Sequence, residues 1–339
     1  MLVESIMKLF RRLGIDLGTA NTRIWEAGVG VVLQEPSVVA IGVDDRRVLA
    51  VGSEAKKMLG KTPEYIEVIR PMKDGVIADY EVTEAMIKQI LRQVMGQFWL
   101  IGPEVMVCVP AGVTQVEQKA VLDATLAAGA RKAYLIDKPL AAAIGAKIPV
   151  SEPYGNMIVD IGGGATEAAV IALGGVVTHQ TVRLGGNRLD EIIMENIKKK
   201  YNVIIGEQTA ELIKIKIGSA TKLKRPESME VNGRDSVSGL PKAVSIDSEI
   251  VYEWIRPILD GIIEIIRRTL EITPPELVAD IFDRGMVISG GTSQLRNLNM
   301  LLTREIGVSA HLVSEPQLSV IKGTGVALEN MDSYWRAIR

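Results

Sequence analysis

Two short segments of the chain share one pattern, and this repetition constrains the fold more than any other feature. The first is LGIDLGTANTRI at residues 13–24, and the second is MIVDIGGGATEAAV at residues 157–170. In each, an apolar stretch carries one aspartate, turns at glycine and continues as a second apolar stretch, which is typical of a β-hairpin with a glycine-rich turn. Aligned, the segments pair Asp16 with Asp160, Gly18 with Gly162 and Thr22 with Thr166. Two distant copies of one hairpin indicate an internal duplication.

Strands and helices are predicted to alternate around both hairpins. A strand at residues 104–109 leads to a helical segment that ends at Gly129, and a strand before Pro139 leads to an alanine-rich helix. This alternation predicts an α/β fold in two similar halves, and 339 residues are enough for two domains. A long helical pattern before Pro274 contains Pro257, which predicts a boundary or a kink there.

Composition excludes several kinds of site. A formal net charge of −2 lacks the basic surplus expected of a nucleic-acid-binding protein. The single cysteine, Cys108, lies in an apolar run and is predicted to be a core residue. His179 and His311 have no partner at metal-ligand spacing, so we expect no zinc site. No run reaches the ~18 apolar residues of a membrane-spanning helix, and no secretory signal is evident, so we expect a cytoplasmic protein.

The N-terminal residues 1–12 have an amphipathic pattern. Leu2, Ile6, Leu9 and Phe10 recur at helical spacing, and charged residues occupy much of the other side. One interpretation is a frayed end, or a helix packed on the body of the protein. The other is a short helix that lies in a membrane interface with its arginines toward lipid phosphates.

The two hairpins suit a polyphosphate bound between them. Glycines allow the backbone to approach phosphates closely and to direct N–H groups at them. Asp16 and Asp160, at the ends of buried strands, would hold a magnesium ion directly or through its waters. A third glycine turn at Gly290 and Gly291 adds a further candidate contact. Neither a Walker P-loop nor a dinucleotide-binding glycine motif is present, which argues against those classes.

These segments also carry a family resemblance. IDLGTANT, VDIGGGATE and ISGGTS, in this order, resemble the two phosphate motifs and the adenosine motif of the actin, heat-shock ATPase and sugar-kinase superfamily. Within it the chain is similar, nearly end to end, to the bacterial actin homologues of the MreB family, as in EPSVVAIG, IGEQTAELIKIKIGSA and TPPELVADIFDRG. The resemblance implies an actin-like ATPase fold, an α/β architecture of two duplicated domains, each with a smaller inserted subdomain, around a nucleotide cleft.

The resemblance also implies subdomain limits and partners. After the amphipathic segment 1–12, the expected ranges are 13–32, 75–146 and 316–339 for subdomain IA, 33–74 for IB, 147–182 and 245–315 for IIA, and 183–244 for IIB. The family binds ATP or GTP with Mg²⁺, and its subunits stack into paired protofilaments. These filaments bind the inner face of the cytoplasmic membrane and direct cell-wall synthesis, which supports rod shape.

Site residues follow from the matched motifs. The expected nucleotide-binding positions are Gly18, Thr19, Ala20, Asn21, Gly162, Gly163, Gly164, Glu211, Lys214, Gly290, Gly291, Thr292 and Ser293. The expected metal-side carboxylates are Asp16 and Asp160. Thr292 stands where the family usually has a third glycine, which puts the base selectivity in doubt.

Two positions depart from the family where water is held for hydrolysis. Lys138 replaces a glutamate that positions or activates the attacking water, and Ala165 replaces a threonine that helps to hold it. A protonated amine cannot accept the proton of the water. Asp137 is adjacent and is the candidate substitute base, although consecutive strand residues face opposite sides. Glu117 is a poorer candidate, because Thr114 and Glu117 have capping-box spacing. We therefore expect nucleotide binding with slow or absent hydrolysis.

A loop before residue 104 carries four large apolar residues, Phe98, Trp99, Leu100 and Ile101. They either fill the core beneath the loop or, as the family resemblance implies, insert into the bilayer beside the N-terminal helix. With both features present we expect a cytoplasmic protein that lies peripherally on the inner membrane face. It would assemble with itself, with a hydrolysing paralogue and with membrane proteins of cell-wall synthesis. The alternatives are a small-molecule kinase and a chaperone-type ATPase of the same superfamily.

Overall fold

The structure is a computed structural model that describes residues 11–96, 99 and 101–339. The predictions for Leu2, Ile6, Leu9 and Phe10, and for Phe98 and Leu100, fall outside the described residues. Within the described part of the chain, no helix has the length and apolar character needed to cross a membrane.

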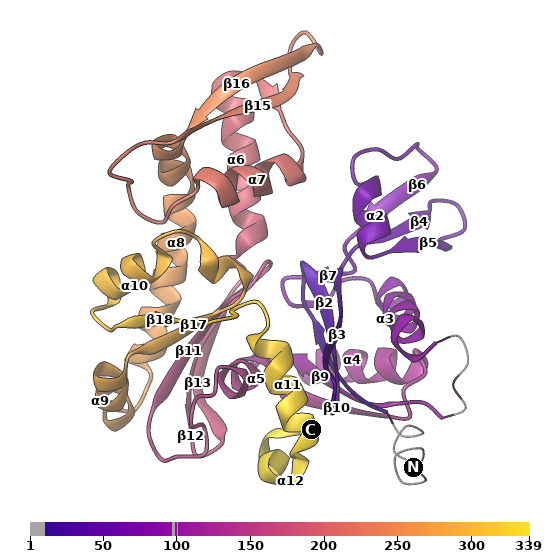
Figure 1. The fold of residues 1–339 in the computed structure, drawn as a ribbon, viewed down its shortest axis with the longest axis vertical. Helices are drawn as coiled ribbons and strands as arrows, with labels where there is room; N and C mark the ends of the chain where they lie inside the picture. The colour runs from indigo at the N-terminus through magenta and orange to yellow at the C-terminus, as the bar shows by residue number, and fades with distance from the viewer. Residues whose placement is uncertain (1–10, 97–98, 100) are drawn as a thin grey trace.

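Two five-stranded sheets form the centres of two similar halves (Figure 1). The first has the order β10-β9-β1-β2-β3 and the second the order β13-β12-β11-β17-β18. Their strands are β1 (Arg12–Leu17), β2 (Asn21–Glu26), β3 (Gly30–Pro36), β9 (Glu104–Val109) and β10 (Lys132–Asp137), then β11 (Asn156–Ile161), β12 (Thr166–Ala172), β13 (Gly175–Val182), β17 (Met286–Ser289) and β18 (Ala310–Leu312).

Strand directions repeat between the sheets, which confirms the duplication. β1, β2 and β3 form an antiparallel meander, and β9 then adds parallel to β1 and β10 parallel to β9. β11, β12 and β13 form the same meander, followed by parallel β17 and β18. The two sequence motifs are therefore the β1–β2 and β11–β12 hairpins, at equivalent places in the two sheets.

A small insert extends from the first half. Its sheet has the order β5-β4-β6, made of β4 (Val39–Gly42), β5 (Val48–Val51) and β6 (Ile66–Ile69), and α2 (Ser53–Met58) packs beside it. The predicted start of this insert at residue 33 is too early. β3 continues to Pro36 in the large sheet, because its ladder with β2 runs to the Asn21–Pro36 pair. A short hairpin of β7 (Met72–Lys73) and β8 (Val76–Ile77) leads back to the first half.

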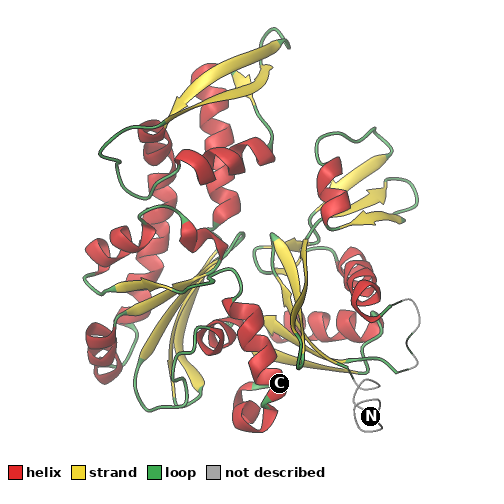
Figure 2. Ribbon diagram, in the orientation of Figure 1, coloured by secondary structure: helices red, strands yellow, loops and turns green. Residues whose placement is uncertain are grey.

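A larger insert extends from the second half in the same direction, as Figure 2 shows. It contains α6 (Gly186–Tyr201), α7 (Glu207–Ile217) and a sheet of β14 (Val203–Ile204), β15 (Ser228–Asp235) and β16 (Pro241–Asp247). β16 continues to Asp247, beyond the predicted limit at residue 244, because its pairing with β15 extends to Ser228 opposite Asp247.

Helices cover the outer faces of both sheets. The first half carries α3 (Tyr80–Met95) and α4 (Gln115–Ala127), and the second carries α8 (Ser248–Glu271), α9 (Pro275–Arg284) and α10 (Leu298–Ile306) (Figure 1). The boundary considered at Pro257 is absent, because α8 continues through this residue as one helix. Its buried face packs into the core of the second half, which stabilises the helix beyond what the missing proline N–H removes.

Two helices join the halves. α5 (Lys138–Gly145) and α11 (Ser319–Glu329) lie between the sheets (Figure 1), followed by α12 (Met331–Tyr334) and the 3₁₀ turn η2 (Trp335–Ala337). One hydrophobic cluster combines Met106 and Cys108 of the first sheet with Ile158 and Ala169 of the second and with residues of both helices. A Cβ atom added to Gly323 would lie 1.7 Å from the carbonyl oxygen of Ala141, so the two helix backbones are nearly in contact. This cluster therefore belongs to both halves and joins them.

Candidate nucleotide-binding site

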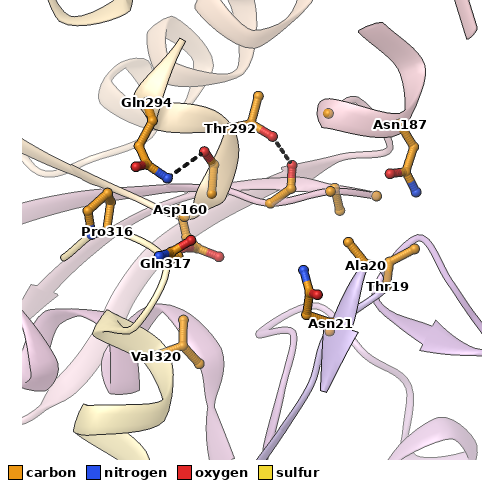
Figure 3. Close-up of a pocket in the computed structure, with 18 of the residues that line it drawn as sticks. Thr19, Ala20, Asn21, Asp160, Asn187, Thr292, Gln294, Pro316, Gln317 and Val320 are labelled. Carbon is orange, nitrogen blue, oxygen red and sulfur yellow. Dashed lines mark hydrogen bonds between the residues drawn. The ribbon is translucent and has the colours of Figure 1, made fainter. Parts of the chain in front are cut away.

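A cavity of about 630 Å³ lies between the two halves. This volume is in the range of pockets that hold small molecules. Figure 3 shows Thr19, Ala20 and Asn21 on one wall, and Thr292 and Gln294 on the opposite one. The expected residues that line it are Asp16, Gly18, Thr19, Ala20, Asn21, Lys138, Asp160, Gly162, Gly163, Gly164, Ala165, Glu211, Lys214, Gly290, Gly291 and Thr292. The structure thus gathers segments from the whole length of the chain at one place.

The turns of the two hairpins touch each other. A Cβ atom added to Gly163 would lie 2.8 Å from the Cβ of Ala20, and one added to Gly164 would lie 2.6 Å from the Oγ1 of Thr19. Real Cβ atoms do not approach so closely, so glycine is required at both positions. Thr19 Oγ1 in turn accepts a hydrogen bond from the backbone N–H of Gly75 at 3.0 Å. The contact forms a continuous glycine-rich surface from both halves, as a bound polyphosphate needs.

The start of α6 supports the second turn. The N–H of Gly186 donates to the carbonyl oxygen of Gly162 at 3.0 Å, and the N–H of Asn187 donates to that of Gly163 at 2.8 Å. Gly186 and Asn187 both line the cavity, although sequence reasoning missed them. The signal was the Gly185–Gly186 pair at the start of a helix, since glycines at a helix start are typical of phosphate sites.

Buried charged groups form the floor of the cavity. Asp16, Asp160 and Glu167 are at most 4% exposed. The Nζ of Lys138 lies 3.3 Å from Asp160 Oδ2, and Ser289 Oγ donates to Asp160 Oδ1 at 2.8 Å. On Asp16, Oδ1 accepts from the Cys108 thiol and Oδ2 from Arg23, at 3.3 Å and 3.4 Å. Glu167 Oε1 accepts from the N–H of Ala111 at 3.1 Å. All three carboxylates therefore already have partners from the chain.

Cys108 behaves as the core residue that its sequence context predicts. Burial, and then the nearby Asp16 carboxylate, raise the pKa of the Cys108 thiol well above its ordinary value. The sulfur consequently stays protonated and can donate to Asp16.

The opposite end of the cavity carries the expected adenosine side. Lys214 lies on α7 and donates to Asp190 Oδ2 at 2.7 Å and to the carbonyl oxygen of Gly186 at 3.0 Å. Glu211 Oε2 lies 3.5 Å from Lys56 Nζ, which joins the two inserts above the cavity. The lining residues that the sequence did not predict there are Ile215, Gln294, Leu295, Arg296, Pro316, Gln317 and Val320.

The glycine turn after β17 is also part of this end. It includes the 3₁₀ turn η1 (Gly291–Gln294). Thr292 Oγ1 donates to the carbonyl oxygen of Gly162 at 2.7 Å, shown as a dashed line in Figure 3, and so ties this turn to the second phosphate turn. Ser293 does not line the cavity: its buried hydroxyl donates to the carbonyl oxygen of Gly290 at 2.6 Å. The prediction of Ser293 as a contact residue is corrected to a role within the turn.

Comparison with known proteins identifies the family. The model of the MreB/Mbl protein family matches residues 10–336. The chain belongs to the MreB/Mbl family. It is 49% identical to the cell shape-determining protein MreB of Haemophilus influenzae, over 98% of this chain and 97% of the relative. It is 46% identical to the cell shape-determining protein Mbl of Bacillus subtilis, over 95% of this chain and 97% of the relative.

Solved structures agree with this assignment. MreB5 of Spiroplasma citri bound to AMPPNP has a TM-score of 0.91 and is 34% identical, with 96% of this chain and 98% of that chain covered. MamK in a double helical filament has a TM-score of 0.79 over 94% of this chain and 99% of that chain, at 23% identity, and shows the shared actin-like fold. Family membership over nearly the whole chain favours the filament interpretation over the kinase and chaperone alternatives.

The two positions at which the sequence resemblance predicts a departure from the family both line the cavity. Lys138 begins α5 directly after β10, and Ala165 ends the second phosphate turn. Burial alone would lower the pKa of Lys138, but the carboxylates of Asp160 and Asp16 outweigh it, so this pKa is raised above its ordinary value. Lys138 is thus an ammonium ion that donates hydrogen bonds and accepts none.

Neither candidate substitute base reaches the cavity. Asp137 points to the other side of β10, where it forms hydrogen bonds of 2.5 and 2.6 Å with Arg339, and it is not among the lining residues. The prediction of Asp137 as a catalytic residue is corrected, because side chains alternate along a strand. Glu117 forms the predicted capping box with Thr114 at the start of α4. Among the described residues, neither Asp137 nor Glu117 therefore takes the place of the glutamate that the resemblance leads us to expect at position 138.

Trp99 packs against the body of the protein. It is half-buried against the hydrophobic core of the first half, and a Cβ atom added to Gly129 would lie 3.2 Å from its ring. Ile101 is half-buried as well. For Trp99 this contact agrees with the core alternative, since a large ring gains from contact with an apolar surface. Insertion of the loop into a membrane stays a prediction.

Glu167 makes stability depend on pH. Burial above all, and Asp160 in addition, raise its pKa from 4.5 to about 7, while Lys138 opposes the shift. A raised folded-state pKa stabilises the protein at low pH, and this stabilisation is lost as the pH rises through about 7. The neutral variant Glu167→Gln does not have this pH dependence. We therefore expect its unfolding free energy, relative to that of the parent, to increase by about 2–3 kcal/mol when the pH is raised from 5 to 8. Urea unfolding of both nucleotide-free proteins measures this gain, and a parent–variant difference that is the same at both pH values would contradict it.

Proposed function

We propose that the chain is an ATP-binding cytoskeletal protein that assembles into filaments and supports rod cell shape. Membership of the MreB/Mbl family supports the cytoskeletal role, since the relatives are named cell shape-determining proteins. The observation that carries nucleotide binding is the contact of the two glycine turns across the cavity. MreB5 of Spiroplasma citri, bound to AMPPNP in one structure and to ADP in another, supports an adenine nucleotide over GTP.

The proposed binding is accompanied by slow hydrolysis. Lys138 and Ala165 both line the cavity, and the sequence resemblance suggests that they stand at the two positions where the family holds water. Neither side chain can accept a proton. Such a protein would keep its filaments in the ATP state, and a hydrolysing paralogue that assembles with it would supply the turnover. The expected Mg²⁺ site does not fit Asp16 and Asp160 well, because the oxygens of both already have partners from the chain.

Membrane attachment is part of the same proposal. The amphipathic pattern of residues 1–12 supports a peripheral position on the inner face of the cytoplasmic membrane. Membrane proteins of cell-wall synthesis are the proposed partners there, by analogy with the family. Co-sedimentation with vesicles of anionic phospholipid tests this attachment. We expect the full chain to pellet with vesicles and a chain without residues 1–10 to stay in solution.

Sedimentation with ATP tests the core of the proposal. We expect the full chain to pellet when ATP is added and to release little phosphate. The variant Gly163→Val should neither bind ATP nor pellet, because its side chain would meet Ala20. Gly175→Val is the matched control, since a Cβ atom there meets nothing within 4 Å. A parent that binds no ATP, or a Gly163→Val variant that behaves like the parent, would contradict the proposed site.

A further inference from the structure

The Lys138 ammonium lies where the phosphates would be held. Its Nζ is 3.3 Å from Asp160 Oδ2, and a Cβ atom added to Gly162 would lie 3.8 Å from it. Gly162 begins the second phosphate turn, so the charge lies directly against that turn. Both side chains line the cavity, and that of Lys138 is 18% exposed whereas that of Asp160 is 2% exposed, so the ammonium is the more accessible group of this pair.

The backbone fixes this position. Lys138 is the first residue of α5, and Pro139 follows it at the start of the helix. The preceding residues are held in β10, where Ile136 is buried and Asp137 is paired with Arg339 on the opposite side. The backbone from which the Lys138 side chain extends is therefore fixed at the floor of the cavity.

Each oxygen of the two carboxylates Asp16 and Asp160 already has a partner from the chain. Asp160 uses one oxygen for Lys138 and the other for Ser289, and the oxygens of Asp16 accept from Cys108 and Arg23. Among the residues that the structure describes, no group of three or more histidine, cysteine, aspartate or glutamate side chains is arranged to hold a metal. A divalent ion bound directly here would have to displace the ammonium, since the two positive charges would repel each other at this distance.

From this geometry we propose that Lys138 takes the place of the divalent metal ion, so that the chain binds the terminal phosphates of its nucleotide without Mg²⁺. An ammonium has three donors and interacts with phosphate as a compact point charge. The Lys138 ammonium would contact the terminal phosphate from the floor of the cavity. The backbone N–H groups of the two glycine turns would contact the same phosphate from the walls. The inference rests on the proposed function, because it concerns the phosphate end of the same cavity.

Calorimetric titration of the full chain with ATP tests this inference. One titration contains Mg²⁺ and the other an excess of EDTA. We expect the two dissociation constants to agree within about threefold, because the fixed cation is present in both. Filaments should also pellet with ATP in EDTA. A dissociation constant that is about a hundredfold weaker in EDTA would overturn the inference.

Variants of Lys138 test whether its charge is what allows ATP to bind without Mg²⁺. Lys138→Gln should weaken ATP binding in EDTA about 10- to 100-fold, since it removes one charged hydrogen-bond donor, and Mg²⁺ should restore part of the loss. Lys138→Arg keeps the charge and should bind in EDTA like the parent. Lys88→Gln, on the exposed face of α3, removes the same charge far from the floor and is the matched control.

The outcomes separate this inference from the proposed function. If the parent binds ATP in neither titration, the proposed function is wrong. If it binds only with Mg²⁺, the proposed function stands and this inference is wrong. If Lys138→Gln is folded by thermal unfolding and binds ATP in EDTA like the parent, Lys138 is not the cation. If Lys138→Gln does not fold, the parent and Lys138→Arg titrations in EDTA still decide the question.

Discussion

The double variant Lys138→Glu, Ala165→Thr is expected to release phosphate from ATP about 10²–10⁴ times faster than the parent, which is the range for a general base. The first change supplies a carboxylate that can accept a proton from water, and the second supplies a hydroxyl that can hold this water. Both positions line the cavity, so the new groups would face a terminal phosphate bound beside the second glycine turn as proposed. Phosphate release in the presence of Mg²⁺ measures the gain.

Single variants and a folding control make this result interpretable. Ala165→Thr alone should gain little, because Lys138 remains. The new carboxylate joins the buried side chains of Asp16, Asp160 and Glu167, so thermal unfolding must show that the double variant is folded. If the parent already hydrolyses ATP at the rate of the double variant, another residue holds the water and our interpretation of Lys138 is wrong.

Replacing Gly323 with alanine is expected to lower the free energy of unfolding by about 3 kcal/mol, the upper part of the usual range for overpacking a core. The new Cβ atom would lie 1.7 Å from the carbonyl oxygen of Ala141, so α5 and α11 would have to move apart. Gly145 is in the same situation, since a Cβ atom added to it would lie 1.8 Å from the carbonyl oxygen of Ser319. Backbone atoms cannot rotate away as a flexible side chain can, which makes this contact costly to change.

Urea unfolding of the variant and the parent measures this loss. Gly175→Ala is the matched control, because a Cβ atom there meets nothing within 4 Å. The variant should also bind ATP more weakly, since Lys138 begins α5 and Val320, near the start of α11, lines the cavity. A Gly323→Ala variant as stable as the parent would show that the two helices do not approach as closely as described.

Much of the site could be predicted from the sequence because its motifs are local. The pattern of one aspartate followed by a glycine turn specifies a hairpin within about a dozen residues, and two such patterns specify the duplication. The same local order places Lys138 after a strand and Thr114 at a helix cap, and the structure agrees at both places. These features depend on neighbours in the chain, so the sequence alone was sufficient to predict them.

What only the tertiary structure decided involves partners distant in the chain. Asp137, on the far side of its strand, finds its partner in Arg339, 202 residues later in the chain, and Lys138 is held as a cation by Asp160 and Asp16. Trp99 is directed inward by the core of the first half, and Pro257 is tolerated because the helix around it packs on the second. Each outcome depends on contacts between residues that are distant in the chain. A local sequence pattern does not specify which of these residues will be in contact after folding.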